Sequence, residues 1–254
     1  MSSPKPTIAF SPGAWHDPAC LQPITSILSS HGYKTHPVSL PSIGCDLRGE
    51  PPPQSWDVDV DAIRAALLSH LYQGEDVVLV VHSYSGTVGS EAVRGLTKKD
   101  WEGSGVRRGG VVAMVYMCAV VIPLGAWVWQ RNGGKPLQAE RTIIEGDLSY
   151  VRDTEPWFYN ECSLELQAEA KKHLRSHAWK AFMSPLTYEA FRHLPSTYLM
   201  CENDQAVKIE IQEAIVAANP ECWKIERCDG DHSPFLSRPE FTVGVIRKAA
   251  GEKL

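Results

Sequence analysis

The sequence of 254 residues has no long apolar segment of the kind found in secretory leaders and membrane spans. Its first ten residues, MSSPKPTIAF, contain no extended apolar region, so we expect no signal peptide. The most apolar stretch, residues 110–124, is interrupted by Tyr116 and Pro123. Because a membrane helix needs about 20 apolar residues, this stretch predicts a buried strand instead.

An excess of positive charge is also missing. The net charge is −5 and the isoelectric point is near 6.0. Neither value favours binding to nucleic acid or to an anionic membrane surface. We therefore expect the partner to be a small-molecule substrate, with no nucleic acid and no membrane. The sequence leaves open whether the chain forms a homodimer.

Paired metal-binding or disulfide motifs are absent as well. The seven cysteines are odd in number and scattered, and no two of them form a CxxC pair. This usage is typical of reduced, mostly buried thiols in a cytoplasmic protein. His173 and His177 lie four residues apart on a predicted helix, but no HExxH motif surrounds them. A packed or solvated face is favoured there, and we expect neither metal nor cofactor.

Alternating strand and helix patterns are what the sequence does contain. Residues 77–81 are an apolar run of five, typical of a central parallel strand that is covered on both faces. Before this run, apolar residues recur at helical spacing in a segment that starts near Asp57. Residues 33–40 predict another strand, and Pro37 places it near a sheet edge. The pattern predicts an α/β fold with a doubly wound, mostly parallel sheet.

The pattern changes in the middle of the chain. Residues 126–195 are rich in Trp, Glu and Lys and include helical stretches such as 164–182. Strand and helix alternation resumes at Ser196. We therefore predict a core formed by residues 1–125 and 196–254, with residues 126–195 as an inserted helical cap.

Three polar residues follow the ends of predicted strands. Ser83, Asp204 and His232 come in this order along the chain. Since ligands bind beyond the carboxyl ends of parallel strands, these side chains should meet. A serine hydroxyl becomes nucleophilic when a histidine accepts its proton, and a carboxylate orients that histidine. Each residue alone also fits a turn or a helix cap, and Glu202 is a rival acid, but the set of three predicts a catalytic triad.

The segment VVLVVHSYSGTV, residues 77–88, offers two serines. A nucleophile elbow is a sharp turn that needs small residues two positions before and two positions after the serine. Ser83 lies two residues beyond the strand, whereas Ser85 lies four residues beyond it. The strand register therefore selects Ser83, with Ser85 in the place of one usual glycine. Val81 occupies the place of the second usual glycine, two residues before Ser83, and departs from the pattern because it is not small.

The motifs PGAWHDP, VVHSYSG, PSTYLMCENDQAV and GDHSPFLSRPE resemble those of the α/β-hydrolase superfamily over nearly the whole chain. Within it, the sequence is similar to the small plant esterase and hydroxynitrile-lyase-like branch and to related fungal and bacterial hydrolases. The resemblance implies that Ser83 is the nucleophile, His232 the general base and Asp204 its orienting acid. It also implies an oxyanion hole formed by the backbone N–H groups of Tyr84 and Ala14.

Two departures from the family pattern affect the expected site. Pro12 stands where many relatives have a histidine before the Gly-Ala-Trp run, so Trp15 stays a second candidate for the donor in that loop. Ser233 stands where hydroxynitrile lyases of this branch have a lysine, which disfavours cyanohydrin cleavage. Pro234 and Phe235 follow it and predict an apolar pocket edge, as in an esterase.

These observations predict a cofactor-free serine hydrolase that cleaves a small, largely apolar ester or lactone through an acyl-enzyme on Ser83. Four aromatic residues are expected to shape its substrate pocket: Trp15, Trp127, Trp157 and Phe158. Two alternatives stay open, since one fold hosts many chemistries. The same triad could be used for carbon–carbon bond cleavage or cyclisation of a polyketide-like metabolite, or the chain could be a slow, hydrolase-like ligand receptor.

Overall fold

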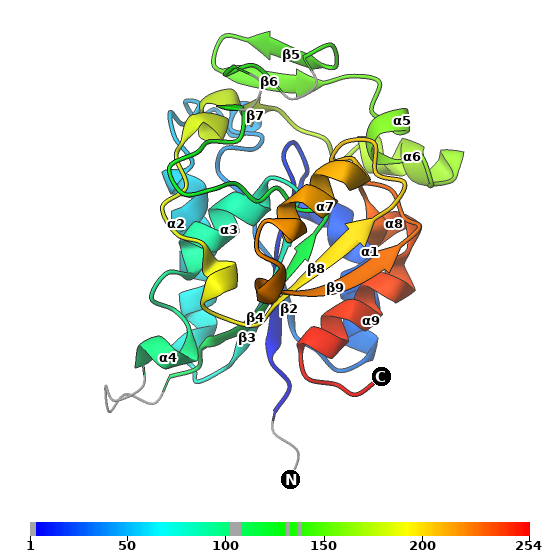
Figure 1. Cartoon of the computed structure of the whole chain (residues 1–254). Helices are drawn as coiled ribbons and strands as arrows, with labels where there is room; N and C mark the ends of the chain where they lie inside the picture. The colour runs from blue at the N-terminus through cyan, green and yellow to red at the C-terminus, as the bar shows by residue number, and fades with distance from the viewer. Residues whose placement is uncertain (1–3, 102–107, 131–132, 137–138) are drawn as a thin grey trace.

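A six-stranded parallel sheet forms the centre of the computed structural model, which describes residues 4–101, 108–130, 133–136 and 139–254 (Figure 1). The strand order is β2-β1-β3-β4-β8-β9, and every neighbouring pair is parallel. The strands are β1 (Thr7–Ser11), β2 (Thr35–Pro37), β3 (Val77–His82), β4 (Val111–Met117), β8 (Ser196–Cys201) and β9 (Trp223–Cys228). The predicted doubly wound, mostly parallel sheet is confirmed.

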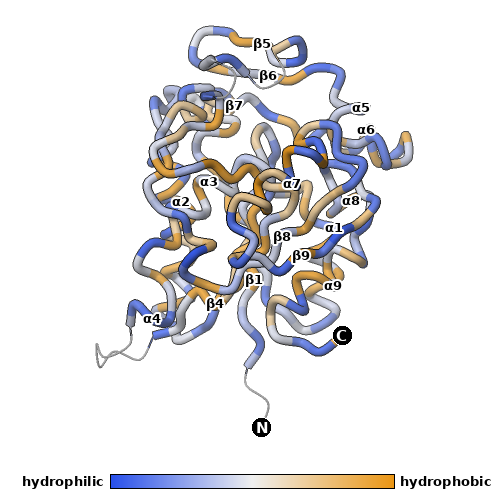
Figure 2. Tube along the Cα trace, viewed as in Figure 1, coloured by the Kyte–Doolittle hydropathy of each residue, from blue (hydrophilic) through white to orange (hydrophobic). Residues whose placement is uncertain are grey.

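Helices cover both faces of this sheet. Alternate residues of β3 point to opposite faces. Leu79 packs in one apolar cluster with helices α2, α3 and α7, whereas Val80 packs in a second cluster with α1 and α9. Figure 2 shows apolar segments converging on the sheet between the helices. The helices of these layers and their connections are α1 (Gln22–Ser30), α2 (Asp57–Leu71), α3 (Ser85–Val93), α4 (Lys98–Trp101), α7 (Ile209–Ala217), α8 (Pro234–Ser237) and α9 (Pro239–Ala249).

The segment between β4 and β8 lies beyond the carboxyl ends of the strands (Figure 1). Its described residues include two α-helices, α5 (Glu155–Phe158) and α6 (Leu164–Lys171). It also contains an antiparallel sheet in the order β5-β6-β7, which the sequence analysis did not expect. The three strands are β5 (Thr142–Glu145), β6 (Leu148–Val151) and β7 (His177–Ala178).

The prediction of a continuous helical stretch over residues 164–182 is wrong. Helix α6 ends at Lys171, and the chain then turns to form β7, which pairs with β6. His177 also forms a bridge with Ile43, so contacts that are distant in the sequence override the local helical pattern. His173 and His177 therefore do not share a helix.

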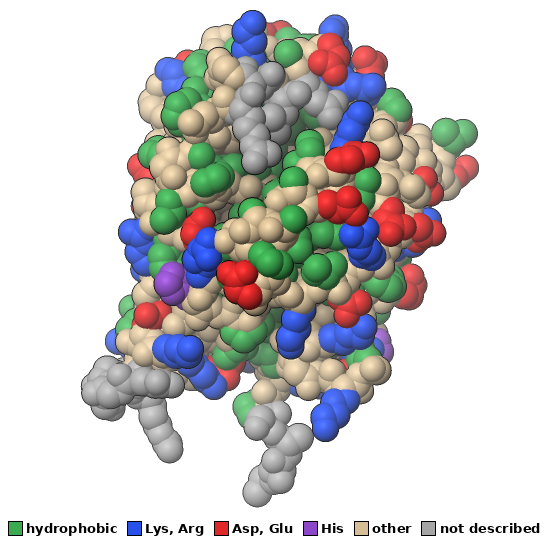
Figure 3. Space-filling view, in the orientation of Figure 1, with side chains coloured by type: hydrophobic (Ala, Val, Ile, Leu, Met, Phe, Trp, Pro, Cys, Tyr) green, Lys and Arg blue, Asp and Glu red, His purple; other side chains and the backbone are tan. Residues whose placement is uncertain are grey.

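Two further features agree with the sequence. Strand β2 is at the edge of the sheet, as Pro37 indicated. All seven cysteines are free thiols, and six of them are buried. Among the described residues, no helix is long and apolar enough to cross a membrane. Lys, Arg, Asp and Glu side chains are intermixed on the face that Figure 3 shows, with no large area of one sign.

Candidate active site

Ser83 lies on the turn between β3 and α3. The strand ends at His82 and the helix begins at Ser85. Ser83 has a positive φ of 52°, a conformation that a non-glycine residue adopts only at an energetic cost. The turn leaves Ser83 half-buried while its neighbours on both sides are buried. This geometry is that of a nucleophile elbow.

Two glycines of α3 make the elbow fit against the sheet. A Cβ atom on Gly86 would lie 2.3 Å from the carbonyl oxygen of Val120, so only glycine permits this close approach. A Cβ atom on Gly89 would lie 2.4 Å from Cγ1 of Val81. The structure thus explains the irregular Val81: its side chain occupies the space left by a glycine one turn into the following helix.

Ser85 has a different environment from Ser83. It is fully buried, and its Oγ donates to the carbonyl oxygen of Pro12 at 2.5 Å. Oγ of Ser85 also lies 2.7 Å from Oγ of Ser11, and the Ser11 hydroxyl is the donor in this second hydrogen bond. Ser85 therefore ties the elbow to the loop after β1. No ring nitrogen of a histidine contacts Ser85 among the described residues.

The structure brings Ser83, His232 and Asp204 together. Nε2 of His232 lies 2.9 Å from Oγ of Ser83, and Nδ1 lies 2.8 Å from Oδ2 of Asp204. The rival acid Glu202 is exposed, and its carboxylate instead lies 3.8 Å from Arg227. Of the two acids, only Asp204 contacts the histidine.

The Asp204 carboxylate has its own set of donors. Its Oδ1 accepts the backbone N–H groups of Ala206 and Val207, at 2.7 and 2.8 Å. Nε2 of Gln212 lies 3.3 Å from Oδ2 and also donates to the carbonyl of Val207. The sequence analysis missed Gln212, a buried polar residue of α7 whose position among the apolar residues of that helix was the available signal.

Two buried histidines, also missed by the sequence analysis, hold the loops around the triad. Nδ1 of His82 accepts the N–H of Gly13 at 3.1 Å, and its Nε2 donates to the carbonyl of His232 at 2.7 Å. Nδ1 of His16 donates to the carbonyl of Ala14, and its Nε2 accepts the hydroxyl of Tyr159. Burial lowers the pKa of His16 to about 4 and that of His82 well below its usual value, so both rings are neutral.

The backbone N–H groups expected to form the oxyanion hole have no hydrogen-bond acceptor in the part of the chain that the structure describes. The backbone N–H groups of Tyr84, Ala14 and Trp15 donate to no group within the described residues. Gly13 brings the first loop against the elbow, since a Cβ atom there would lie 2.6 Å from Nδ1 of His82. Trp15 has a positive φ of 64°. Both first-loop candidates, Ala14 and Trp15, therefore have a free N–H beside the elbow.

A narrow apolar cavity of about 50 Å³ adjoins Ser83 and His232. Trp15, Trp157 and Phe158 line it, as does Trp129. Trp127, the fourth expected pocket residue, does not line this cavity, and its place in the substrate pocket stays a prediction. The chain turns at residues 128–129, and the ring of Trp129 stacks on Phe182 with 4.7 Å between centroids. With no regular periodicity in this loop, the sequence could not distinguish the two tryptophans.

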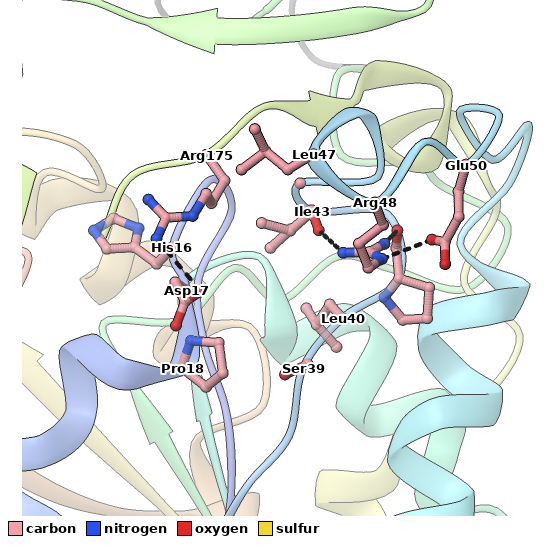
Figure 4. Close-up of a pocket in the computed structure, with 12 residues that line it drawn as sticks. His16, Asp17, Pro18, Ser39, Leu40, Ile43, Leu47, Arg48, Glu50 and Arg175 are labelled. Carbon is pink, nitrogen blue, oxygen red and sulfur yellow. Dashed lines mark hydrogen bonds and ion pairs between the residues drawn. The ribbon is translucent and has the colours of Figure 1, made fainter. Parts of the chain in front are cut away.

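Two larger pockets lie nearby. A groove of about 460 Å³ adjoins the cavity, because Val120, Val128 and Trp157 line both. Another pocket, of about 430 Å³, is lined in part by Arg48 and Arg175 (Figure 4). Its charged side chains form ion pairs with one another, Arg48 with Glu50 and Arg175 with Asp17. Its volume is therefore no reason to regard this pocket as a catalytic site.

The site does not suit a metal ion. Ligand atoms of His82, Cys118 and His232 lie within 4.8 Å of one another. The ring nitrogens of both histidines are already engaged in hydrogen bonds. Burial raises the pKa of the Cys118 thiol to about 12, which keeps the sulfur protonated and a poor ligand. His82 and Cys118 fit a hydrogen-bonded core beneath the triad, and His232 is part of the triad itself.

Comparison with known proteins agrees with this geometry. The sequence profile of the alpha/beta hydrolase family matches residues 8–245. The chain belongs to the alpha/beta hydrolase family. It is an enzyme of this class, and the resemblance seen in its motifs is confirmed.

Individual relatives match this hydrolase over nearly its whole length. An alpha/beta hydrolase of Aspergillus novofumigatus (strain IBT 16806), nvfD, is 38% identical, covering 98% of each chain. Methylesterase 18 of Arabidopsis thaliana is 25% identical over 95% of each chain. The crystal structure of an Arabidopsis methylesterase, MES16, superposes with a TM-score of 0.73 at 21% identity, covering 97% of this chain and 99% of that one. This last likeness shows the shared fold.

Proposed function

We propose that this hydrolase cleaves a small, largely apolar carboxylic ester or lactone through an acyl-enzyme on Ser83. The observation that carries the proposal is the 2.9 Å contact between Oγ of Ser83 and Nε2 of His232. A nucleophile and a base within hydrogen-bond reach, with a carboxylate on the far side of the base, is the arrangement that activates a serine.

Acylation proceeds in two proton transfers. As Oγ of Ser83 attacks the ester carbonyl carbon, Nε2 of His232 takes the hydroxyl proton, and the Asp204 carboxylate stabilises the resulting imidazolium. When the tetrahedral intermediate collapses, the bond to the alkoxy oxygen breaks and His232 returns the proton to the leaving alcohol. Water then attacks the acyl group, with His232 as general base, and releases the carboxylic acid and free Ser83.

The negative charge on the carbonyl oxygen needs hydrogen-bond donors fixed in advance. The free N–H group of Tyr84 directly follows the nucleophile and is one such donor. The free N–H groups of Ala14 and Trp15 make the first loop the source of the second. Loss of one donor of this kind typically slows the chemical step by about 10²- to 10³-fold.

The cavity and the relatives support a small leaving group. The space at Ser83 has a volume of about 50 Å³ and is walled by aromatic side chains, so it suits a compact apolar group. The adjoining groove of about 460 Å³ offers room for a larger acyl portion. Two curated relatives are described as methylesterases, which favours a methyl ester as the substrate.

A panel of methyl and p-nitrophenyl esters of increasing acyl length tests this proposal. We expect turnover, and we expect Asp204→Asn to lower kcat by about 10³- to 10⁴-fold because His232 loses its orienting carboxylate. Glu202→Gln is the matched control, and its kcat should stay within twofold of that of the unmodified protein. A large loss of kcat in Glu202→Gln, with little loss in Asp204→Asn, would contradict the assignment of Asp204 to the triad. Covalent labelling of Ser83 without turnover of any ester would contradict the esterase assignment.

A further inference from the structure

A buried carboxylate outside the triad contacts the side chain of the residue that follows Ser83. Asp59 of α2 is fully buried, and its carboxylate accepts the phenolic hydroxyl of Tyr84 at 2.9 Å. It also accepts the backbone N–H of Ser42 at 2.9 Å and the hydroxyl of Ser42 at 2.5 Å. A buried charge without such donors would be very unfavourable, so these contacts hold the side chain in one position.

The direction of each hydrogen bond in this network is determined. Since the Ser42 hydroxyl donates to Asp59, its oxygen accepts from Nε2 of His177 at 2.9 Å. His177 then carries its proton on Nε2, and its bare Nδ1 has no partner among the described residues. Burial lowers the pKa of His177 to about 3, which keeps the ring neutral. All the donors converge on the Asp59 carboxylate.

The network reaches both sides of the expected oxyanion hole. Tyr84 supplies the N–H on the elbow side, and its ring is also held edge-on against His177, with 4.9 Å between centroids. On the first-loop side, Nε1 of Trp15 donates to Oγ of Ser149 at 3.1 Å, and Ser149 donates to the carbonyl of His177 at 2.9 Å. Strands β6 and β7 thus connect Asp59 to the residue after Ala14.

We propose that Asp59 is a positioning residue for the reaction at Ser83: it holds the Tyr84 side chain and thereby fixes the backbone N–H that stabilises the oxyanion. The inference rests on the proposed function of Ser83. An oxyanion donor acts only when it is held near the position that the charge will occupy, because reorientation during the reaction has a free-energy cost. Tyr84 contacts the reacting carbonyl through its backbone, whereas Asp59 contacts no reacting atom and acts through the side chain of Tyr84 that it holds.

The test is the rate of covalent labelling by a fluorophosphonate, whose phosphoryl oxygen uses the same donors as an ester oxygen. Tyr84→Phe removes the hydroxyl and keeps the ring, and Asp59→Asn keeps the shape of the side chain. We expect each to lower the labelling rate constant about tenfold. The double variant should lose no more than either single variant, because both changes break the same contact. With an ester substrate, kcat should fall while KM stays within twofold.

Tyr116→Phe is the matched control, since Tyr116 is another fully buried tyrosine whose hydroxyl contacts Ser90, away from the triad. Its labelling rate constant should equal that of the unmodified protein. A purely structural effect would lower the fraction of protein that can be labelled and leave the rate constant unchanged, which would overturn the positioning role. Independent, multiplicative losses in the double variant would overturn it too. Absence of labelling in the unmodified protein would instead contradict the function proposed for Ser83.

Discussion

The backbone at Ser83 is held in an unfavourable conformation by the residues around it. A positive φ at a non-glycine residue costs about 1–3 kcal/mol and persists only where packing imposes it. Here the packing comes from α3, which approaches the sheet closely because Gly86 and Gly89 have no side chains. The buried Ser85 hydroxyl adds a tie to the loop after β1.

Gly89→Ala should destabilise the protein. The added methyl group would overlap Cγ1 of Val81, a β-branched side chain that cannot swing away. We expect the free energy of unfolding to fall by about 1–3 kcal/mol, as measured by chemical denaturation. Gly244→Ala in α9 is the matched control: a Cβ atom there meets nothing within 4 Å, so this variant should gain up to about 1 kcal/mol from helix propensity.

A second substitution checks the cause. Val81→Ala in the Gly89→Ala background removes the overlapping atom, so the double variant should be more stable than the sum of the single effects predicts. Additive losses would show that Gly89 has another role. The contact between Val81 and Gly89 could not be predicted from the sequence. Val81 departed from the elbow pattern because its packing partner lies eight residues later, in the following helix.

At the level of the elements, the sequence predicted the parts of the fold that follow from regular patterns. Apolar runs identified β3 and β4, and parallel alignment placed the residues after each predicted strand at one edge of the sheet, which is why Ser83, Asp204 and His232 could be predicted to meet. The β5-β6-β7 sheet could not be predicted in this way. Strand β7 has two residues, too few for any periodicity, and its existence depends on pairing with β6.

The loop between β4 and β5 gives a prediction at this scale. Trp129 lines the cavity and Trp127 does not, so Trp129→Ala should enlarge the space for the leaving group while Trp127→Ala should not. We expect the ratio of kcat/KM for a propyl ester to that for a methyl ester to rise about tenfold in Trp129→Ala, since each of the two additional buried CH₂ groups contributes about 0.8 kcal/mol. Equal shifts in both variants would argue against this assignment of the cavity wall.

Across the whole molecule, Glu252 joins the two ends of the described chain. Its carboxylate accepts from Lys5 at 2.7 Å, from Arg247 at 2.5 Å and from the hydroxyl of Tyr33 at 2.8 Å. These donors lower its pKa to about 2, with the hydrogen bond from Lys5 the largest cause. The ionised form is therefore favoured in the folded state, where the side chain is 23% exposed.

Glu252→Gln should reduce stability by about 1 kcal/mol near neutral pH, a modest value because the carboxylate is partly exposed. A pKa lower in the folded than in the unfolded state stabilises the fold above the unfolded value, and this contribution is lost as the pH falls through the folded value. The difference between the variant and the unmodified protein should therefore shrink as the pH falls from about 5 towards 2. Glu145→Gln, at an exposed residue of β5, is the matched control and should change the free energy of unfolding at neutral pH by no more than about 0.5 kcal/mol in chemical denaturation.

The central claim is that Ser83 is the residue that reacts. The most direct measurement is mass spectrometry of peptides after treatment with a fluorophosphonate. The account predicts one adduct, on Ser83, with labelling abolished in Ser83→Ala and retained at least in part in Ser85→Ala. An adduct on Ser85, or labelling that persists in Ser83→Ala and disappears in Ser85→Ala, would contradict it.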